Sequence, residues 1–185
     1  RAADWFLERE AGRQGTPRLI EKPGRIVIAP FGFTLTAKPD RIDMMPDGRV
    51  HIYDYKTGKP PTAKQQQAFD KQLLLEAAMA ERGAFEVFGP VEVDGATYIG
   101  LGSAPVEEPI ALPPGETDKA WDGLCALLAA FAGRGRGYTS RRAVAEERME
   151  GDYDHLARYG EWEMSDPPVS EDVGPEDVAL PEERS

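Results

Sequence analysis

Two aspartates and a lysine lie on either side of a predicted turn in the first third of the chain. Asp40 precedes the turn residues Pro46-Asp47-Gly48, and Asp54 and Lys56 follow them. Carboxylate oxygens are the ligands that Mg²⁺ prefers, and this ion keeps bound water available for chemistry. A neighbouring lysine can hold an attacking water or stabilise the negative charge that develops on a phosphate. These residue types therefore suit metal-dependent hydrolysis of a phosphate ester.

The spacing predicts that these three charged side chains share one face of a β-hairpin. If residues 46–48 form the turn, with Gly48 in the left-handed conformation, Asp40 faces Asp54 across the two strands. Side chains alternate along a strand, so Lys56 points to the same side as Asp54. The other residues of this face are Ile42, Met44, Val50 and Ile52. Because they are apolar, we expect the face to point toward the core.

Two carboxylates at the end of a core-facing surface need compensation. Like charges at opposed strand positions repel each other, and buried charges need partners. A divalent cation bound between Asp40 and Asp54 would remove the repulsion. In the alternative interpretation, Lys56 pairs with one of the aspartates in a purely structural ion-pair network. The spacing alone favours neither interpretation.

The surrounding sequence predicts elements in an order typical of a mixed α/β (α+β) domain. Helical periodicity that stops at Gly83 predicts a long helix, Thr117 is a typical N-cap, and Asp94-Gly95 predicts a second hairpin. The expected elements are a helix at 2–14, strands at 18–21, 25–29, 31–37, 41–45, 49–55, 91–93 and 96–101, a helix at 63–82, a Pro-rich connection at 103–116 and a helix at 117–133.

Length and composition indicate one domain with a tail. The 185 residues are 41% hydrophobic and 30% charged, which excludes both a membrane protein and a fully disordered chain. We assign residues 1–164 to the domain and expect residues 165–185, which are acidic and rich in proline, to be disordered. The chain starts with Arg1 rather than Met, so we expect an upstream segment.

Charge and cysteine content restrict the partners and cofactors. The net charge of −11 is unlike that of an independent nucleic-acid binder. Cys125 is the single cysteine, which excludes an internal disulfide and a four-cysteine zinc or iron–sulfur site. The chain has no signal peptide and no apolar run of about 18 residues, so we expect a cytoplasmic protein without membrane contact. One basic cluster could follow a DNA backbone, form a solvated loop or contact the rest of the protein; it consists of Arg134, Arg136, Tyr138, Arg141 and Arg142.

The residues around the predicted hairpin resemble a known family. The matching runs are Asp40-Arg41-Ile42-Asp43, Ile52-Tyr53-Asp54-Tyr55-Lys56-Thr57-Gly58 and Gln72-Leu73-Leu74-Leu75. They are similar to the nuclease domain of the RecB/AddB group, within the PD-(D/E)xK nuclease superfamily. The likeness is greatest to the C-terminal nuclease domain of bacterial AddB, a subunit of a helicase–nuclease that processes double-strand breaks. It covers residues 17–83 well and residues 151–158 more loosely.

The resemblance implies a role for each matching residue. Asp40 and Asp54 would bind the metal ion, and the backbone carbonyl of Tyr55 would complete part of the coordination. Lys56 would be the catalytic lysine. Glu21 matches the acidic residue that precedes the first aspartate in the family, and it would bind the metal or position a water.

Other positions match the family less completely. Gln72 corresponds to the glutamine that lies near the DNA backbone, whereas Glu76 stands where the family commonly has a tyrosine. The family also has a metal-binding histidine well upstream of its first acidic residue. The two histidines of this chain, His51 and His155, both lie after that point, so the metal site is expected to lack this ligand.

The opposite face of the hairpin carries a second set of polar residues. Arg41 is the second candidate for a DNA contact, although a surface ion pair with Asp43 is the simpler interpretation. His51 lies opposite Asp43, and we expect it to be paired and exposed.

The resemblance also implies a fold and a function. The fold would be restriction-endonuclease-like, a mixed central β-sheet flanked by helices. The activity would be Mg²⁺-dependent hydrolysis of DNA, single-stranded or at duplex ends, with Mn²⁺ as a substitute and no iron–sulfur cluster. The DNA would come from a helicase, with the rest of that subunit and a partner subunit bound, during double-strand break repair and recombination at the bacterial nucleoid. The alternative is a nuclease-fold module with an inactive or incomplete site that serves as a structural or protein-interaction domain.

Overall fold

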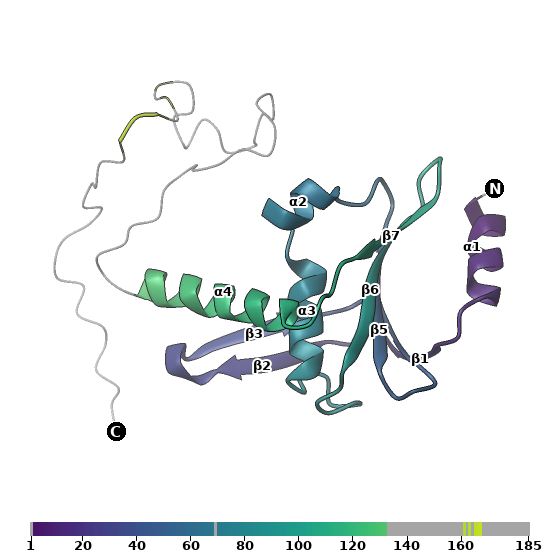
Figure 1. Ribbon diagram of the computed structural model, residues 1–185, viewed down its shortest axis with the longest axis horizontal. Coiled ribbons are helices and arrows are strands. Elements are labelled where there is room, and N and C mark those ends of the chain that lie inside the picture. Colours follow the sequence, from purple (N-terminus) through teal and green to yellow (C-terminus); the bar gives the residue numbers. More distant parts are fainter. Residues whose placement is uncertain (1, 69, 133–160, 162, 164, 168–185) are drawn as a thin grey trace, which may run out of the picture. The chain divides into compact units, whose positions relative to one another are not determined.

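The structure is a computed structural model that describes residues 2–68, 70–132, 161, 163 and 165–167. Residues 1–133 form one compact unit, which contains all the helices and strands discussed below (Figure 1). The elements are α1 (Ala2–Ala11), β1 (Thr16–Ile20), β2 (Gly24–Ile28), a 3₁₀ turn (Ala29–Phe31), β3 (Phe33–Ala37), β4 (Arg41–Met44), β5 (Val50–Lys56), α2 (Ala63–Ala68), α3 (Gln72–Glu81), β6 (Val93–Gly100), β7 (Val106–Ile110) and α4 (Glu116–Ala132). The predicted basic cluster at 134–142 and most of the predicted tail lie outside the described residues.

Strands β4 and β5 form the predicted hairpin with the predicted register. Ile42 pairs with Ile52, and Asp43 pairs with His51. The backbone N–H of Gly48 donates to the carbonyl of Met45 at 3.0 Å, and the φ angle of Gly48 is 87°. A left-handed glycine is what a short hairpin turn of this kind requires. The turn therefore fixes which side chains of β4 and β5 share a face.

The hairpin lies inside a five-stranded mixed sheet with the order β1-β4-β5-β6-β7. β5 and β6 are parallel, and the other three neighbouring pairs are antiparallel. Parallel strands need a long crossover connection, and here α2 and α3 form it. The predicted mixed sheet flanked by helices is therefore confirmed.

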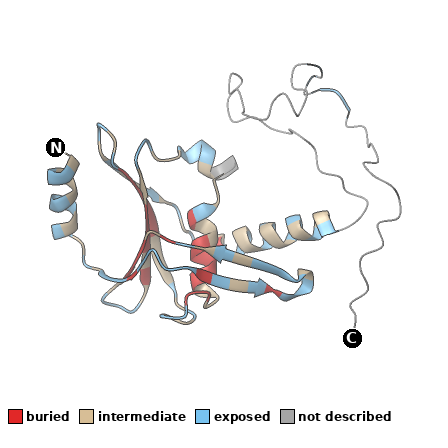
Figure 2. Cartoon of the chain, turned by 180° about the vertical axis from the view of Figure 1, so that it is seen from behind, coloured by how far each residue is buried: buried red, intermediate tan, exposed pale blue. Residues whose placement is uncertain are grey.

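One face of the sheet packs against α3, where the buried residues concentrate (Figure 2). Leu73, Ala77 and Ala80 of this helix are at most 1% exposed. They pack against Ile42 and Ile52 of the hairpin, which are fully buried. Small alanine side chains let a helix approach a sheet closely. This face is the apolar, inward one that the alternation in the sequence predicts.

The other face of the sheet is also covered, and its cover is α1. Glu10 of α1 pairs with Arg41 at 2.6 Å, and Phe6 packs edge-on against Tyr55. The expected Arg41–Asp43 ion pair exists, but its expected position at the surface is wrong. Arg41 is 8% exposed and Asp43 is fully buried, because Glu10 of α1 pairs with Arg41 and the backbone at Gly15, just after α1, lies directly against Asp43.

The predicted helix over residues 63–82 is wrong as a single element, because it is divided into α2 and α3. The break is stabilised at Asp70, whose carboxylate accepts a hydrogen bond from the Tyr98 hydroxyl at 2.6 Å and one from the backbone N–H of Gln72 at 3.3 Å. The second of these bonds satisfies a backbone donor at the start of α3.

Among the described residues, none of the helices combines the length and the apolar character needed to cross a membrane.

The predicted second hairpin at Asp94-Gly95 is also wrong. Both residues lie inside β6, which continues past them and runs parallel to β5. Gly95 is needed here because a Cβ atom would come within 2.8 Å of the His51 ring. The true partner of β6 on its other side is β7, which lies within the segment expected to be a Pro-rich connection.

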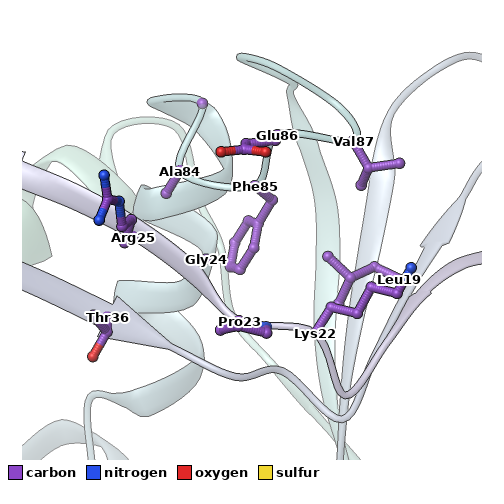
Figure 3. Close-up of a pocket in the computed structure, with 11 residues that line it drawn as sticks. Leu19, Lys22, Pro23, Gly24, Arg25, Thr36, Ala84, Phe85, Glu86 and Val87 are labelled. Atoms are coloured by element: carbon purple, nitrogen blue, oxygen red, sulfur yellow. The ribbon is translucent and has the colours of Figure 1, made fainter.

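The predicted strands at 25–29 and 31–37 form a separate two-stranded sheet of β2 and β3. It is anchored at Gly24, where the backbone passes directly over the ring of Phe85 (Figure 3). The N–H of Arg25 donates to the carbonyl of Ala84 at 3.0 Å beside this contact. A hollow next to the anchor is lined by Leu19, Lys22 and Val87, among others.

We predict that Gly24→Ala destabilises the protein, because a Cβ at this position would overlap the buried Phe85 ring. Overpacking of this kind costs about 1–3 kcal/mol. Chemical denaturation would measure the change in the free energy of unfolding. Gly123→Ala in α4 is the matched control, since nothing lies near its Cβ position, and it should stabilise by about 0.5–1 kcal/mol. Equal stability of Gly24→Ala and wild type would contradict this packing.

Candidate active site

Asp54 and Lys56 lie at the end of the central strand β5 and touch each other. The Lys56 ammonium nitrogen is 2.8 Å from Oδ2 of Asp54. Asp54 is 5% exposed, whereas the Lys56 side chain is 33% exposed. The two side chains therefore share a face, as the strand alternation predicts, with the carboxylate inside and the ammonium group toward solvent.

Asp40 is held next to these residues by the backbone of β5. Its Oδ2 accepts a hydrogen bond from the backbone N–H of Tyr55 at 2.7 Å. Tyr55 points its phenol toward the opposite face, where Arg41 donates to the hydroxyl at 3.4 Å. The use of the Tyr55 carbonyl as a metal ligand remains a prediction.

Gln72, the first residue of α3, connects the site residues to one another. Its amide nitrogen donates to Oδ1 of Asp54 at 2.7 Å and to Oε1 of Glu76 at 3.2 Å. Its amide oxygen accepts from the Lys56 ammonium group at 3.2 Å. These bonds position the aspartate and the lysine. The place of Gln72 near a DNA backbone stays a prediction.

Glu76 is a site residue whose role the sequence did not reveal. It lies one turn after Gln72 and is 4% exposed. Burial raises the pKa of Glu76 to about 7; the hydrogen bond from Gln72 lowers it, while the charges of Asp54 and Asp40 raise it. The available signal was the i, i+4 spacing from Gln72, which places two residues on one helix face.

Two buried oxygens of the site lack hydrogen-bond partners within the described part of the chain. They are Oδ2 of Asp54 and Oε2 of Glu76. Lys56 lies within ion-pair distance of the first but does not form a hydrogen bond with it. Unsatisfied buried acceptors cost free energy, so these oxygens fit a site for a cation.

Glu21 does not join this group. Its side chain is 67% exposed and pairs with Lys38 at 3.0 Å. Its backbone lies beside Asp40, because its N–H donates to the Asp40 carbonyl at 3.1 Å, but its φ angle of 48° belongs to the left-handed region that favours glycine. Across residues 2–68 and 70–132, no group of three His, Cys, Asp or Glu side chains is gathered as a metal site. The expected cluster of Glu21, Asp40 and Asp54 is therefore not assembled.

Arg41 lies on the other face and its donors are engaged within the protein. The guanidinium group forms two bonds of 2.6 Å to Asp43 and one of 2.6 Å to Glu10. A bidentate pair of this kind fixes the side chain strongly. The expected DNA contact through Arg41 is therefore not supported, and its role in this fold is to satisfy the buried Asp43.

His51 is paired but not exposed as expected. Its side chain is 18% exposed and lies 3.7 Å from Asp94. A ring nitrogen is 2.9 Å from the hydroxyl oxygen of Thr97. Burial lowers the pKa of His51, so its neutral form is favoured. It serves the packing of β5 against β6 and has no contact with Asp54 or Lys56 among the described interactions.

Comparison with known proteins gives one family. Residues 1–159 match the family described as the PD-(D/E)XK nuclease superfamily. The matched range contains every residue of the site described above. Together with the mixed central sheet, the match confirms the expected restriction-endonuclease-like fold. None of the curated proteins compared with the chain matches it.

We predict that Glu76 makes the stability of the metal-free protein depend on pH. Its pKa in the fold, about 7, lies above the ordinary value of 4.5, so folding favours the neutral form. This contribution is complete below pH 4.5 and is lost as the pH rises through 7, a loss of about 3 kcal/mol.

The measurement is denaturant unfolding in EDTA between pH 4.5 and pH 8, with Glu76→Gln as the comparison. The glutamine has no titratable group, so the stability of the variant relative to wild type should increase between pH 4.5 and about pH 7 and be constant above that. A constant difference between the two proteins would show that Glu76 does not titrate in this way.

Proposed function

Because this chain belongs to the PD-(D/E)XK nuclease superfamily, we propose that it hydrolyses phosphodiester bonds in DNA, with Asp40, Asp54 and Lys56 as its active site. The observation that carries the proposal is the contact between Lys56 and the buried Asp54 at the end of β5, with Gln72 bonded to both. A buried carboxylate and a half-exposed ammonium group can act together on a phosphate at the surface.

The cofactor we propose is Mg²⁺, with Mn²⁺ as a substitute. Asp40 and Asp54 would hold it, with the Tyr55 carbonyl as a further ligand. The donors fit such an ion, because carboxylate oxygens are hard ligands and Oδ2 of Asp54 is buried without a hydrogen bond within the described residues. When bound, the cation would supply an activated water and stabilise charge on the phosphate.

The residues of the chain would act on the water and on the phosphate. Lys56 would orient the attacking water and place its positive charge next to the phosphate oxygens, where negative charge develops. The water gives up one proton as its oxygen bonds to phosphorus, one phosphorus–oxygen bond of the DNA chain breaks, and the departing oxygen takes up a proton. Gln72 would keep Lys56 and Asp54 in place during this step, because it bonds to both.

For the biological role, we propose that the chain is a RecB/AddB-type domain that cuts single strands or duplex ends delivered by a helicase. The motif around Asp40 and Lys56 supports this assignment. The net charge of −11 also supports it, since an acidic domain binds DNA poorly by itself and benefits from delivery by a larger assembly. The process would be double-strand break repair and recombination, with a partner subunit, at the bacterial nucleoid.

One observation favours a second candidate function. No three-residue cluster of metal ligands is gathered in the described parts of the chain, and Glu21 points into solvent with Lys38. A domain with such a site could serve as a structural or protein-interaction module that keeps the nuclease fold.

We predict that wild type cleaves labelled single-stranded DNA in Mg²⁺ or Mn²⁺, and that Asp54→Asn and Lys56→Ala each slow cleavage by about 100-fold or more. Lys119→Ala, at a highly exposed lysine of α4, is the matched control and should cleave as wild type does. Thermal unfolding would verify that each variant is folded. Cleavage at the wild-type rate by both site variants would exclude this site, and a folded wild type without cleavage in either metal would favour the structural module.

A further inference from the structure

Glu76 is the one buried acid of the site that the family pattern does not explain. We propose that Glu76 is a cation ligand of this protein in place of Glu21, and that the cation lies between Glu76 and Asp54, where the Gln72 amide now bridges them. The proposal rests on the proposed function, since it names a residue of that same site.

The burial of the two carboxylates supports a cation between them. Asp54 is 5% exposed and Glu76 is 4% exposed. Each has one oxygen that is buried and, within the described residues, accepts no hydrogen bond. Oδ2 of Asp54 lies 2.8 Å from the Lys56 ammonium group, whereas Oε2 of Glu76 has no such partner among the described interactions and loses its hydration without compensation. One cation shared by both side chains would compensate the charge of both carboxylates.

The position of the Gln72 amide nitrogen also supports this site. It donates to Asp54 at 2.7 Å and to Glu76 at 3.2 Å, so the two carboxylates are separated by a single nitrogen atom. The two hydrogens on that nitrogen carry only partial positive charges. A divalent cation at the same place would bind Oδ1 of Asp54 and Oε1 of Glu76, the oxygens that now accept from the amide. It would bind them with full charge and at shorter distances, since oxygen ligands lie about 2.0–2.6 Å from Mg²⁺ or Ca²⁺.

Competition with Gln72 accounts for the lack of a ready-made cluster of three metal ligands among the described residues. The cation and the Gln72 amide compete for one place, so binding requires the amide to move out. Gln72 is exposed, which leaves its side chain room to rotate into solvent. Glu76 cannot move in this way, because its neighbours Leu73, Ala77 and Ala80 are packed in the core.

The charges agree with a divalent ion. Asp40, Asp54 and Glu76, when ionised, place three negative charges around the single ammonium group of Lys56. Glu21 cannot contribute equally, because its exposed side chain is already paired with Lys38. A ligand on a packed helix also loses less conformational freedom on binding than an exposed side chain does.

The test is calorimetric titration of the metal-free protein with Mn²⁺ alone, for wild type, Glu76→Gln and Glu21→Gln. We expect Glu76→Gln to weaken Mn²⁺ binding at least tenfold and Glu21→Gln to change it less than twofold. Mn²⁺ should raise the melting temperature of wild type and Glu21→Gln, but not that of Glu76→Gln. Glutamine has the shape of glutamate and can keep the bond to Gln72, so the variant should fold.

Gln72→Ala provides a second variant. It removes the group that competes with the cation, so Mn²⁺ should bind more tightly than to wild type, by several-fold. Unchanged binding by Glu76→Gln, a tenfold loss by Glu21→Gln, or the absence of Mn²⁺ binding by wild type would each overturn the proposal. Weaker binding by Gln72→Ala would overturn the displacement of the amide.

DNA cleavage by the same proteins separates this inference from the proposed function. If wild type cleaves DNA and Glu76→Gln binds Mn²⁺ as wild type does, the inference fails and the nuclease remains. If Mn²⁺ binding depends on Glu76 and wild type does not cleave, the cation site stands and the nuclease function fails.

Discussion

The burial of one carboxylate, Asp54, at the end of a central strand is the constraint on which the structure depends, because a buried charge costs free energy. A buried charge needs partners, and Asp54 obtains them from its own strand through Lys56 and from α3 through Gln72. For these contacts to form, α3 must begin at Gln72 and must lie directly on β5. The break between α2 and α3 at Asp70, bonded to Tyr98 of β6, provides that beginning. The site and the crossover connection are thus specified together.

The two faces of the sheet differ in the chemistry of their buried side chains. The face under α3 is apolar except at its end, where the site residues emerge from the core. The face under α1 is polar and buried, and a network of ion pairs makes it stable: Glu10, Arg13, Arg41, Asp43 and Glu107. Removal of one member would leave an unpaired charge, which costs more than the pair contributes. Interior strands covered on both sides are typical of mixed α/β sheets.

The part of this structure that can be predicted from the sequence depends on interactions between residues that are close together in the chain. The hairpin register followed from its turn residues and from the alternation of Ile42 and Ile52, which act between near neighbours. The break at Asp70 depends on the hydroxyl of Tyr98, and the burial of Arg41 depends on α1, so both required contacts between distant parts of the chain. Asp94-Gly95 gave a turn signal that parallel pairing with β5 overrides. The role of Glu76 could not be predicted from the family pattern. The pattern commonly has a tyrosine at this position, so it predicts a DNA contact and no carboxylate in the site.

The hairpin separates the site from its own turn. Asp40 and Asp54 are held at the open end by the bond from the Tyr55 backbone, while Pro46, Asp47 and Gly48 are exposed at the opposite end. The paired length between them keeps the spacing of the two aspartates independent of how many residues close the loop. An insertion at this turn therefore leaves that spacing unchanged, and an experimenter can attach a dye or an affinity tag there without disturbing the chemistry at the other end.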